Sequence, residues 1–165
     1  MKNIMVEKVT LNIGVGEPGD RLDKAVKLLE SITEAKAVQT KAKKRIPTWS
    51  IRPGLAIAAK VTLRKEKAVN VLKRLLGAVN NELKNKSFDN EGNISFGIKE
   101  YLDIPEAKYD AEIGVMGMEI AVTLTRPGFR IKKRRIKKGR IPSRHRISKE
   151  EAIEFMKKEF GINIK

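Results

Sequence analysis

One stretch of the sequence has the residue spacing of a nucleotide-binding loop. Residues 11–20 read LNIGVGEPGD, in which Gly14, Gly16 and Gly19 match the pattern G-x-G-x-x-G. Glycines at this spacing let a backbone wrap the pyrophosphate of a dinucleotide, provided that a strand precedes the loop and a helix follows it. A strand-like run and a helix-like run do flank these residues, so the pattern needs a second test.

The residues beyond the glycines do not support a dinucleotide site. Such a site needs an acidic side chain about twenty residues further on to bind the ribose hydroxyls, but residues 36–41 read KAVQTK. Pro18 also removes one backbone N–H that could donate to phosphate. We favour a turn between a strand and a helix, with Asp20 as the helix N-cap. A dinucleotide-dependent enzyme using Gly14–Gly19 remains an unlikely alternative.

Other catalytic chemistry has little support. The chain has no Cys, and its one His, His145, lies in an arginine-rich run with no acid nearby in sequence to orient it. No nucleophile, base and orienting group can be assembled from these residues. We therefore expect no enzyme activity, no catalytic residue, no metal, no cofactor and no small-molecule substrate. The absence of Cys fits a reducing interior, and no run approaches eighteen consecutive apolar residues, so we expect a cytoplasmic protein with no membrane partner.

Net charge is the strongest compositional signal. The chain of 165 residues has 36 Lys and Arg against 20 Asp and Glu, a formal net charge of +16. Residues 36–65 contain nine basic residues and no acid, and residues 126–146 contain eleven basic residues and no acid. Residues 82–119 reverse the sign, with nine acids and four bases. Such blocks predict a polyanionic partner for the basic surfaces and a different partner for the acidic one.

The hydrophobic pattern predicts an α+β fold. Alternating apolar residues predict strands at residues 9–13 and 119–125, and apolar residues three or four apart predict a helix at 66–83. Further strands are expected at 37–41, at 55–64 and before residue 101, and further helices after residue 20 and after Ser148, whose pairing with Glu151 forms a capping box. We expect a two-layer sandwich with a mainly antiparallel sheet, helices on one face, and an open face for RNA. Residues 1–128 would form a single domain, and residues 129–165 a basic extension with a short C-terminal helix.

The open face of this sheet is the predicted RNA-binding surface. Alternation that buries Val9, Leu11 and Val61 directs Lys, Arg, Thr and Asn side chains outward, with no acid at these central positions. Gln39 and Lys41 join them if Val38 faces inward. Cations bind phosphates, whereas amides and hydroxyls reach ribose 2′-OH groups. The predicted RNA-binding residues, which include the following basic loop, are Asn12, Gln39, Thr40, Lys41, Lys43, Lys44, Arg45, Lys60, Thr62 and Arg64. An ordinary solvated sheet face is the alternative.

A second basic segment follows the last strand. Residues 128–146 read GFRIKKRRIKKGRIPSRHR, which has few apolar residues, so we expect a flexible tail that becomes ordered on RNA. Its expected phosphate-binding residues are Arg130, Lys132, Lys133, Arg134, Arg135, Lys137, Lys138 and Arg140. Trp49, the only Trp, could stack on a base or pack locally. A nonspecific nucleic-acid-binding protein is the second alternative.

Five blocks of the sequence together resemble one protein family. They are LNIGVGE (11–17), TKAKKRI (40–46), KVTLR (60–64), SFDNEGNISFGIKEY (87–101) and GMEIAVTLTRPG (117–128). The blocks occur in the family's order and resemble the 5S rRNA-binding ribosomal protein of the large subunit, universal family five. The start just before the first block and the basic C-terminal segment are similar to the archaeal and eukaryotic branch.

The resemblance implies partners for three parts of the chain. It implies a structural protein of the central protuberance that attaches 5S rRNA to the subunit and contacts large-subunit rRNA and neighbouring ribosomal proteins. It implies that residues 43–53 approach the P-site tRNA, with contacts from Arg45, Thr48, Trp49, Ser50 and Arg52. It also implies an intersubunit bridge to a basic small-subunit protein, number thirteen, through Glu100, Asp103, Glu106, Asp110 and Glu112.

Overall fold

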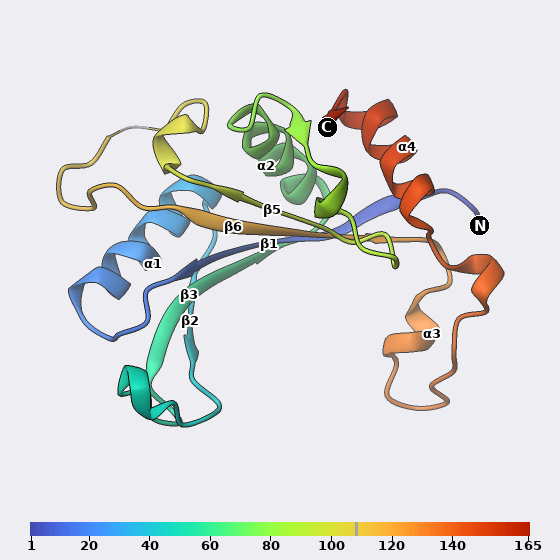
Figure 1. The fold of residues 1–165 in the computed structure, drawn as a ribbon. Helices are drawn as coiled ribbons and strands as arrows, with labels where there is room; N and C mark the ends of the chain where they lie inside the picture. The colour runs from blue at the N-terminus through green and yellow to red at the C-terminus, as the bar shows by residue number, and fades with distance from the viewer. Residues whose placement is uncertain (108) are drawn as a thin grey trace.

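The computed structural model describes residues 1–107 and 109–165, and its centre is a five-stranded sheet (Figure 1). The strands are β1 (Met5–Gly14), β2 (Val38–Lys41), β3 (Ala56–Leu63), β5 (Ile94–Ile98) and β6 (Met118–Thr125). Their order across the sheet is β2-β3-β1-β6-β5, and every pair of neighbours is antiparallel. The predicted α+β class with a mainly antiparallel sheet is confirmed.

Helices α1 (Asp20–Thr33) and α2 (Lys65–Gly77) lie against one face of this sheet, and α4 (Lys149–Phe160) packs into the same core. The short α3 (Arg130–Lys133) follows β6 and extends away from α2 and α4 (Figure 1). Buried apolar residues recur three or four positions apart on both helices, as at Leu22, Ala25 and Leu29 of α1 and at Ala68 and Leu72 of α2, which is the pattern of helices that cover a sheet. Two short strands, β4 (Glu82–Leu83) and β7 (Asn163–Ile164), pair in parallel away from the main sheet. None of the helices in the described ranges combines the length and apolarity needed to cross a membrane.

The strands bury alternate side chains, which sets the two faces of the sheet. Val9, Leu11 and Ile13 of β1 are buried, and their ladder partners Val61 and Leu63 of β3 are buried with them. Side chains that face each other across a ladder point to the same side of a sheet. The intervening residues of both strands therefore point away from the helices.

Two element boundaries differ from the sequence predictions. Gly19, not Asp20, is the N-cap of α1: its φ of 123° favours glycine, and Asp20 is the first residue of the helix. The helix expected over residues 66–83 ends at Gly77, because Asn80 and Asn81 adopt left-handed backbone angles and Leu83 pairs in β4. That pairing joins residues about eighty positions apart, which local periodicity does not reveal.

The C-terminal helix is part of the main core. The capping box of Ser148 and Glu151 is confirmed, and α4 ends at Gly161 in a left-handed conformation, as predicted. Ile147, Ala152 and Met156 are almost fully buried in the same apolar cluster as the strands of the sheet. Residues 147–165 therefore fold onto residues 1–128.

Candidate nucleic-acid interface

The open face is the surface of the sheet that lies away from α1 and α2. Asn12 of β1 pairs with Lys60 of β3, and Thr10 pairs with Thr62, so these four side chains lie side by side on that face. Lys60 and Thr62 are exposed, and Asn12 and Thr10 are half-buried. The face therefore presents an amide, hydroxyls and an ammonium group together, as the alternation predicts.

Gln39 does not share this face, and the expectation that Val38 faces inward is wrong. Val38 pairs with Lys60 and its side chain is 58% exposed, whereas Gln39 pairs with the buried Ala59. The Gln39 amide Nε2 lies 3.2 Å from Oδ1 of Asp23 on α1, to which it donates a hydrogen bond. Strand β2 is a short edge strand with polar residues on both sides, so its alternation gave no signal for which side faces the helices.

The open face also contains carboxylates, which corrects the expectation of a face with no central acid. Glu119 of β6 pairs with Asn12, and the Asn12 amide Nδ2 donates to Glu119 Oε2 over 3.4 Å. At the end of β3, Arg64 lies 3.5 Å from Glu7 of β1. The sequence alone does not identify either acid as part of this face, because it does not show which strands pair with β1.

The loop between β2 and β3, residues 42–55, is a basic projection with an ordered tip. Ile46 and Ile51 form an antiparallel bridge with backbone hydrogen bonds of 3.0 and 3.1 Å. Between them, Trp49 is 70% exposed, and Ser50 adopts a left-handed conformation that closes the turn. The packing alternative for Trp49 is not realised, since its ring lies in solvent. The exposed polar and charged side chains of this region are Lys41, Lys43, Lys44, Arg45, Thr48, Ser50 and Arg52.

Residues 127–146, the basic arm, form a closed loop rather than the flexible tail expected from the sequence. After Pro127 and Gly128 the arm continues through Phe129 and α3, turns, and returns through a 3-10 turn at Ser143–His145. The ring of His145 lies 2.9 Å from the carbonyl oxygen of Pro127, and it packs edge-on against Phe129. All eight predicted phosphate-binding residues of the arm are exposed. The order comes from contacts within the arm and with other elements, which composition alone does not show.

An ion pair lies at the base of the arm. The Arg126 side chain is only 7% exposed; its Nη2 lies 2.6 Å from Glu151 Oε1, and its Nη1 donates to the carbonyl oxygen of Arg146 over 3.0 Å. The backbone N–H of Ser148 and the Arg126 guanidinium both stabilise the Glu151 carboxylate, and they lower the pKa of Glu151 below its ordinary value.

The two basic projections lie on the same side of the sheet. In Figure 1 the β2–β3 loop and the segment with α3 extend downward from opposite ends of the sheet, away from α2 and α4. The Glu7 carboxylate connects the arm to the end of β3 that lies away from the β2–β3 loop, because it pairs with Lys133 of the arm and with Arg64. The open face is thus flanked by cations at both ends.

The glycine loop at the end of β1 is not arranged as a dinucleotide site. The N–H groups of Val15 and Gly16 both donate to the carbonyl oxygen of Ile57, at 3.0 and 2.8 Å, so they are not available to phosphate. Strand β1 also has antiparallel neighbours on both sides, whereas a dinucleotide fold needs parallel ones. In the described part of the chain, no group of three or more metal-ligating side chains is found.

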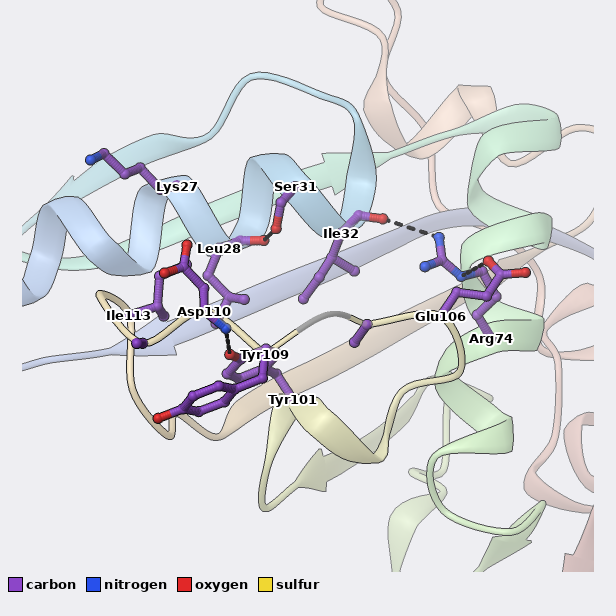
Figure 2. A pocket seen from close by; sticks show the side chains of 12 residues that line it. Lys27, Leu28, Ser31, Ile32, Arg74, Tyr101, Glu106, Tyr109, Asp110 and Ile113 are labelled. Atoms are coloured by element: carbon purple, nitrogen blue, oxygen red, sulfur yellow. Dashed lines mark hydrogen bonds and ion pairs between the residues drawn. The ribbon is translucent and has the colours of Figure 1, made fainter.

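The acidic segment, residues 100–107 and 109–112, lies apart from these basic surfaces, beside a cleft of about 540 Å³ next to α1 (Figure 2). Arg74 of α2 borders the cleft, donates to the carbonyl oxygen of Ile32 over 3.3 Å and lies 3.5 Å from Glu106. The backbone N–H of Asp110 donates to the Tyr101 hydroxyl oxygen over 3.1 Å. The five predicted bridge residues are all exposed in this segment: Glu100, Asp103, Glu106, Asp110 and Glu112.

Comparisons with known proteins agree with the resemblance of the sequence blocks. Residues 1–52 match the family described as Ribosomal protein L5, and residues 56–155 match the model of that ribosomal family's C-terminus. The chain is similar to three archaeal proteins named large ribosomal subunit protein uL5. That of Nanoarchaeum equitans is 54% identical over 165 residues, covering 99% of this chain and 97% of that protein. That of Sulfolobus acidocaldarius is 52% identical over 164 residues (99% and 92%), and that of Methanosphaera stadtmanae is 45% identical over 164 residues (99% and 98%).

Proposed function

The chain belongs to the L5 family of ribosomal proteins, and we propose that it attaches 5S rRNA to the large ribosomal subunit. As a constituent of that subunit it works in the cytoplasm and has a structural rather than a catalytic role. It would sit in the central protuberance, where it would also contact large-subunit rRNA and neighbouring ribosomal proteins.

The open face with its two basic projections is the observation that supports this proposal. Lys60, Thr62 and Asn12 combine an ammonium group, a hydroxyl and an amide on one pleated surface. Phosphate contacts give affinity and orientation, whereas amides and hydroxyls distinguish RNA from DNA through the 2′-OH. If six to ten phosphates are neutralised, affinity falls roughly 10³- to 10⁵-fold between about 50 and 200 mM salt.

The tip of the β2–β3 loop is the proposed tRNA-proximal site. Its turn holds Trp49 in solvent, and the exposed cations Arg45 and Arg52 flank that turn in the sequence. An exposed aromatic ring among cations is suited to stacking on a base or a ribose while the cations bind phosphate. The loop would thus contact the P-site tRNA at a distance from the open face.

The acidic segment is the proposed contact with a basic protein of the small subunit. Two of its carboxylates, Glu106 and Asp110, line the cleft beside α1, and the segment lies apart from the basic arm (Figure 1). Carboxylates weaken RNA binding by repulsion but favour association with a cationic protein surface. The bridge is therefore proposed for this segment and not for the open face.

A competition experiment tests the function. Labelled 5S rRNA is bound to the protein and challenged with unlabelled 5S rRNA, with another folded RNA of similar length, and with duplex DNA. We expect 5S rRNA to compete far better than the other two. Equal competition by all three would instead support the nonspecific nucleic-acid-binding alternative, and tight binding of a labelled dinucleotide would support the enzyme alternative.

A further inference from the structure

The basic arm has an order that its own residues explain only in part. Residues 127–146 contain ten Lys and Arg and no acid, a composition whose self-repulsion favours an extended ensemble. Inside the arm, the His145 ring lies 2.9 Å from the Pro127 carbonyl oxygen and packs against Phe129, and further backbone hydrogen bonds form local turns and join Gly139 to Ile131. Groups outside the arm add contacts that offset its charge.

Three carboxylates from other elements contact the arm or its base. Glu7 of β1 pairs with Lys133, and Glu91, in the turn before β5, lies 3.5 Å from Lys132. The lysine of each pair is half or more exposed, and exposed pairs stabilise little. The third carboxylate, Glu151 of α4, contacts the buried Arg126 at the point where the arm begins.

Arg126 joins the two ends of the arm. It lies directly before the arm, and its guanidinium donates to the backbone of Arg146, where the arm ends. Among the described residues, Glu151 is the only carboxylate that pairs with this guanidinium, and the Nε of Arg126 has no hydrogen-bond partner. Removing the partner of a buried charge is destabilising because that charge is then uncompensated. Loss of the Glu151 charge would therefore weaken this closure, since Arg126 is the buried member of the pair.

We propose that Glu151 is a positioning residue for RNA binding, which holds Arg126 and thereby fixes the basic arm beside the open face before RNA arrives. The identity of the ligand rests on the proposed function; the closure of the arm does not. A segment that is already ordered pays less conformational entropy on binding, so the phosphate contacts of the arm give more affinity. Glu151 itself contacts no RNA in this account.

The proposal predicts a change in RNA affinity opposite in direction to the one that net charge predicts. Removing a carboxylate from a protein that binds RNA reduces repulsion and should tighten binding. Glu151→Gln should instead weaken binding, although it preserves the capping box, which accepts Gln in place of Glu. Glu154→Gln is the matched control, because Glu154 lies on the same helix, is exposed and forms no ion pair in the described ranges. The control should bind as tightly as the wild type or slightly more tightly.

Hydrogen exchange of the free protein, followed by peptide mass spectrometry, tests the closure. We expect Glu151→Gln to speed exchange in residues 130–146 roughly tenfold and to leave the sheet unchanged. Arg126→Lys is the second variant: it keeps the charge, but an ammonium group has no planar fork to reach both the carboxylate and the carbonyl. It should have the same effect on the arm. Unchanged exchange of the arm in both variants would overturn the proposal without any use of RNA.

Binding of 5S rRNA to the same variants tests the consequence. We expect both to bind roughly three- to tenfold more weakly than the wild type, with circular dichroism showing that each is folded. A loosened arm with unchanged or tighter binding would overturn the positioning role. Failure of the wild type itself to bind 5S rRNA would instead contradict the proposed function and the RNA part of this inference, while the exchange result would still decide whether Glu151 closes the arm.

Discussion

At the scale of single residues, position in the sheet decides which polar side chains can meet a ligand. Asn12, Lys60 and Thr62 share one surface because β1 and β3 pair in a register that places them side by side. Asn12 also donates to Glu119, so its amide is partly engaged within the protein. Lysines of the β2–β3 loop are exposed and are free to follow a phosphate backbone. Two kinds of contact, neutral and ionic, can therefore be separated by mutation.

The ionic contribution belongs to the loop lysines. We expect Lys43→Ala with Lys44→Ala to weaken 5S rRNA binding and to reduce the slope of log K against log salt concentration by about 2, because each lysine neutralises about one phosphate. The measurement is a titration at several salt concentrations. Lys157→Ala with Lys158→Ala is the control, since these exposed lysines lie on α4. An unchanged slope in the loop variant would show that these lysines do not meet phosphate.

The neutral contribution is measured at Thr62. Thr62→Val keeps a β-branched side chain in the strand and removes only the hydroxyl. We expect roughly two- to tenfold weaker binding at high salt, where ionic contacts are screened, with no change in the salt slope. Ser31→Ala on α1 removes a hydroxyl on the helix side and should have no effect. Equal binding of the wild type and Thr62→Val would exclude a hydroxyl contact.

At the scale of secondary-structure elements, α4 links the basic arm to the core. Its first turn contains Glu151, which pairs with Arg126, and its buried face contains Ala152 and Met156. The same helix therefore stabilises the fold and orients the segment that precedes it. Changes to its two sides should have different effects.

The Glu151 carboxylate of α4 should make the stability of the folded state depend on pH. The lowered pKa of Glu151 means that its ionised form stabilises the folded state; this stabilisation is complete above the ordinary carboxyl value of 4.5 and is lost as pH falls through the lowered value. The charged groups that face it are Arg126 and, at longer range, Lys2. We expect the melting temperature of the wild type to exceed that of Glu151→Gln near neutral pH, and the difference to shrink in acid. A difference independent of pH would contradict this account.

The buried apolar side chains of α4 should stabilise the folded state. Met156 is fully buried, so Met156→Ala should lower the free energy of unfolding by about 2–5 kcal/mol, through reduced apolar burial and the cavity that remains. Chemical denaturation measures this change. Lys157→Ala, one residue further on but exposed, is the control. A decrease below about 0.5 kcal/mol, the size of an ordinary surface effect, would mean that α4 is not part of the core.

The elements that could be predicted from sequence are those with strong local patterns. The strands around Leu11 and Ile120 alternate strictly, and the capping box at Ser148 fixes the start of α4. The side that Gln39 faces could not be predicted, since β2 is short and polar. The end of α2 and the order of the basic arm could not be predicted either, because both depend on pairings with residues distant in sequence: β7 for the first, Glu7 and Glu151 for the second.

At the scale of the whole molecule, the fold separates charge by surface. The basic blocks at residues 36–65 and 126–146 contribute the β2–β3 loop and the basic arm, which project from the same side of the sheet (Figure 1). The acidic segment borders the cleft beside α1 instead (Figure 2). The charge blocks of the sequence predicted two kinds of partner surface, one basic and one acidic. That the two basic blocks project from the same side of the sheet is visible only in the structure (Figure 1).

Hydroxyl-radical footprinting of 5S rRNA tests most directly whether the open face binds RNA. The wild type should protect a limited set of riboses, and Lys60→Ala with Thr62→Val should remove part of that protection while the circular dichroism of the protein stays unchanged. Protection that is identical for the wild type and the double variant, or that spreads evenly along the RNA, would contradict the central claim that this sheet surface binds a particular RNA structure.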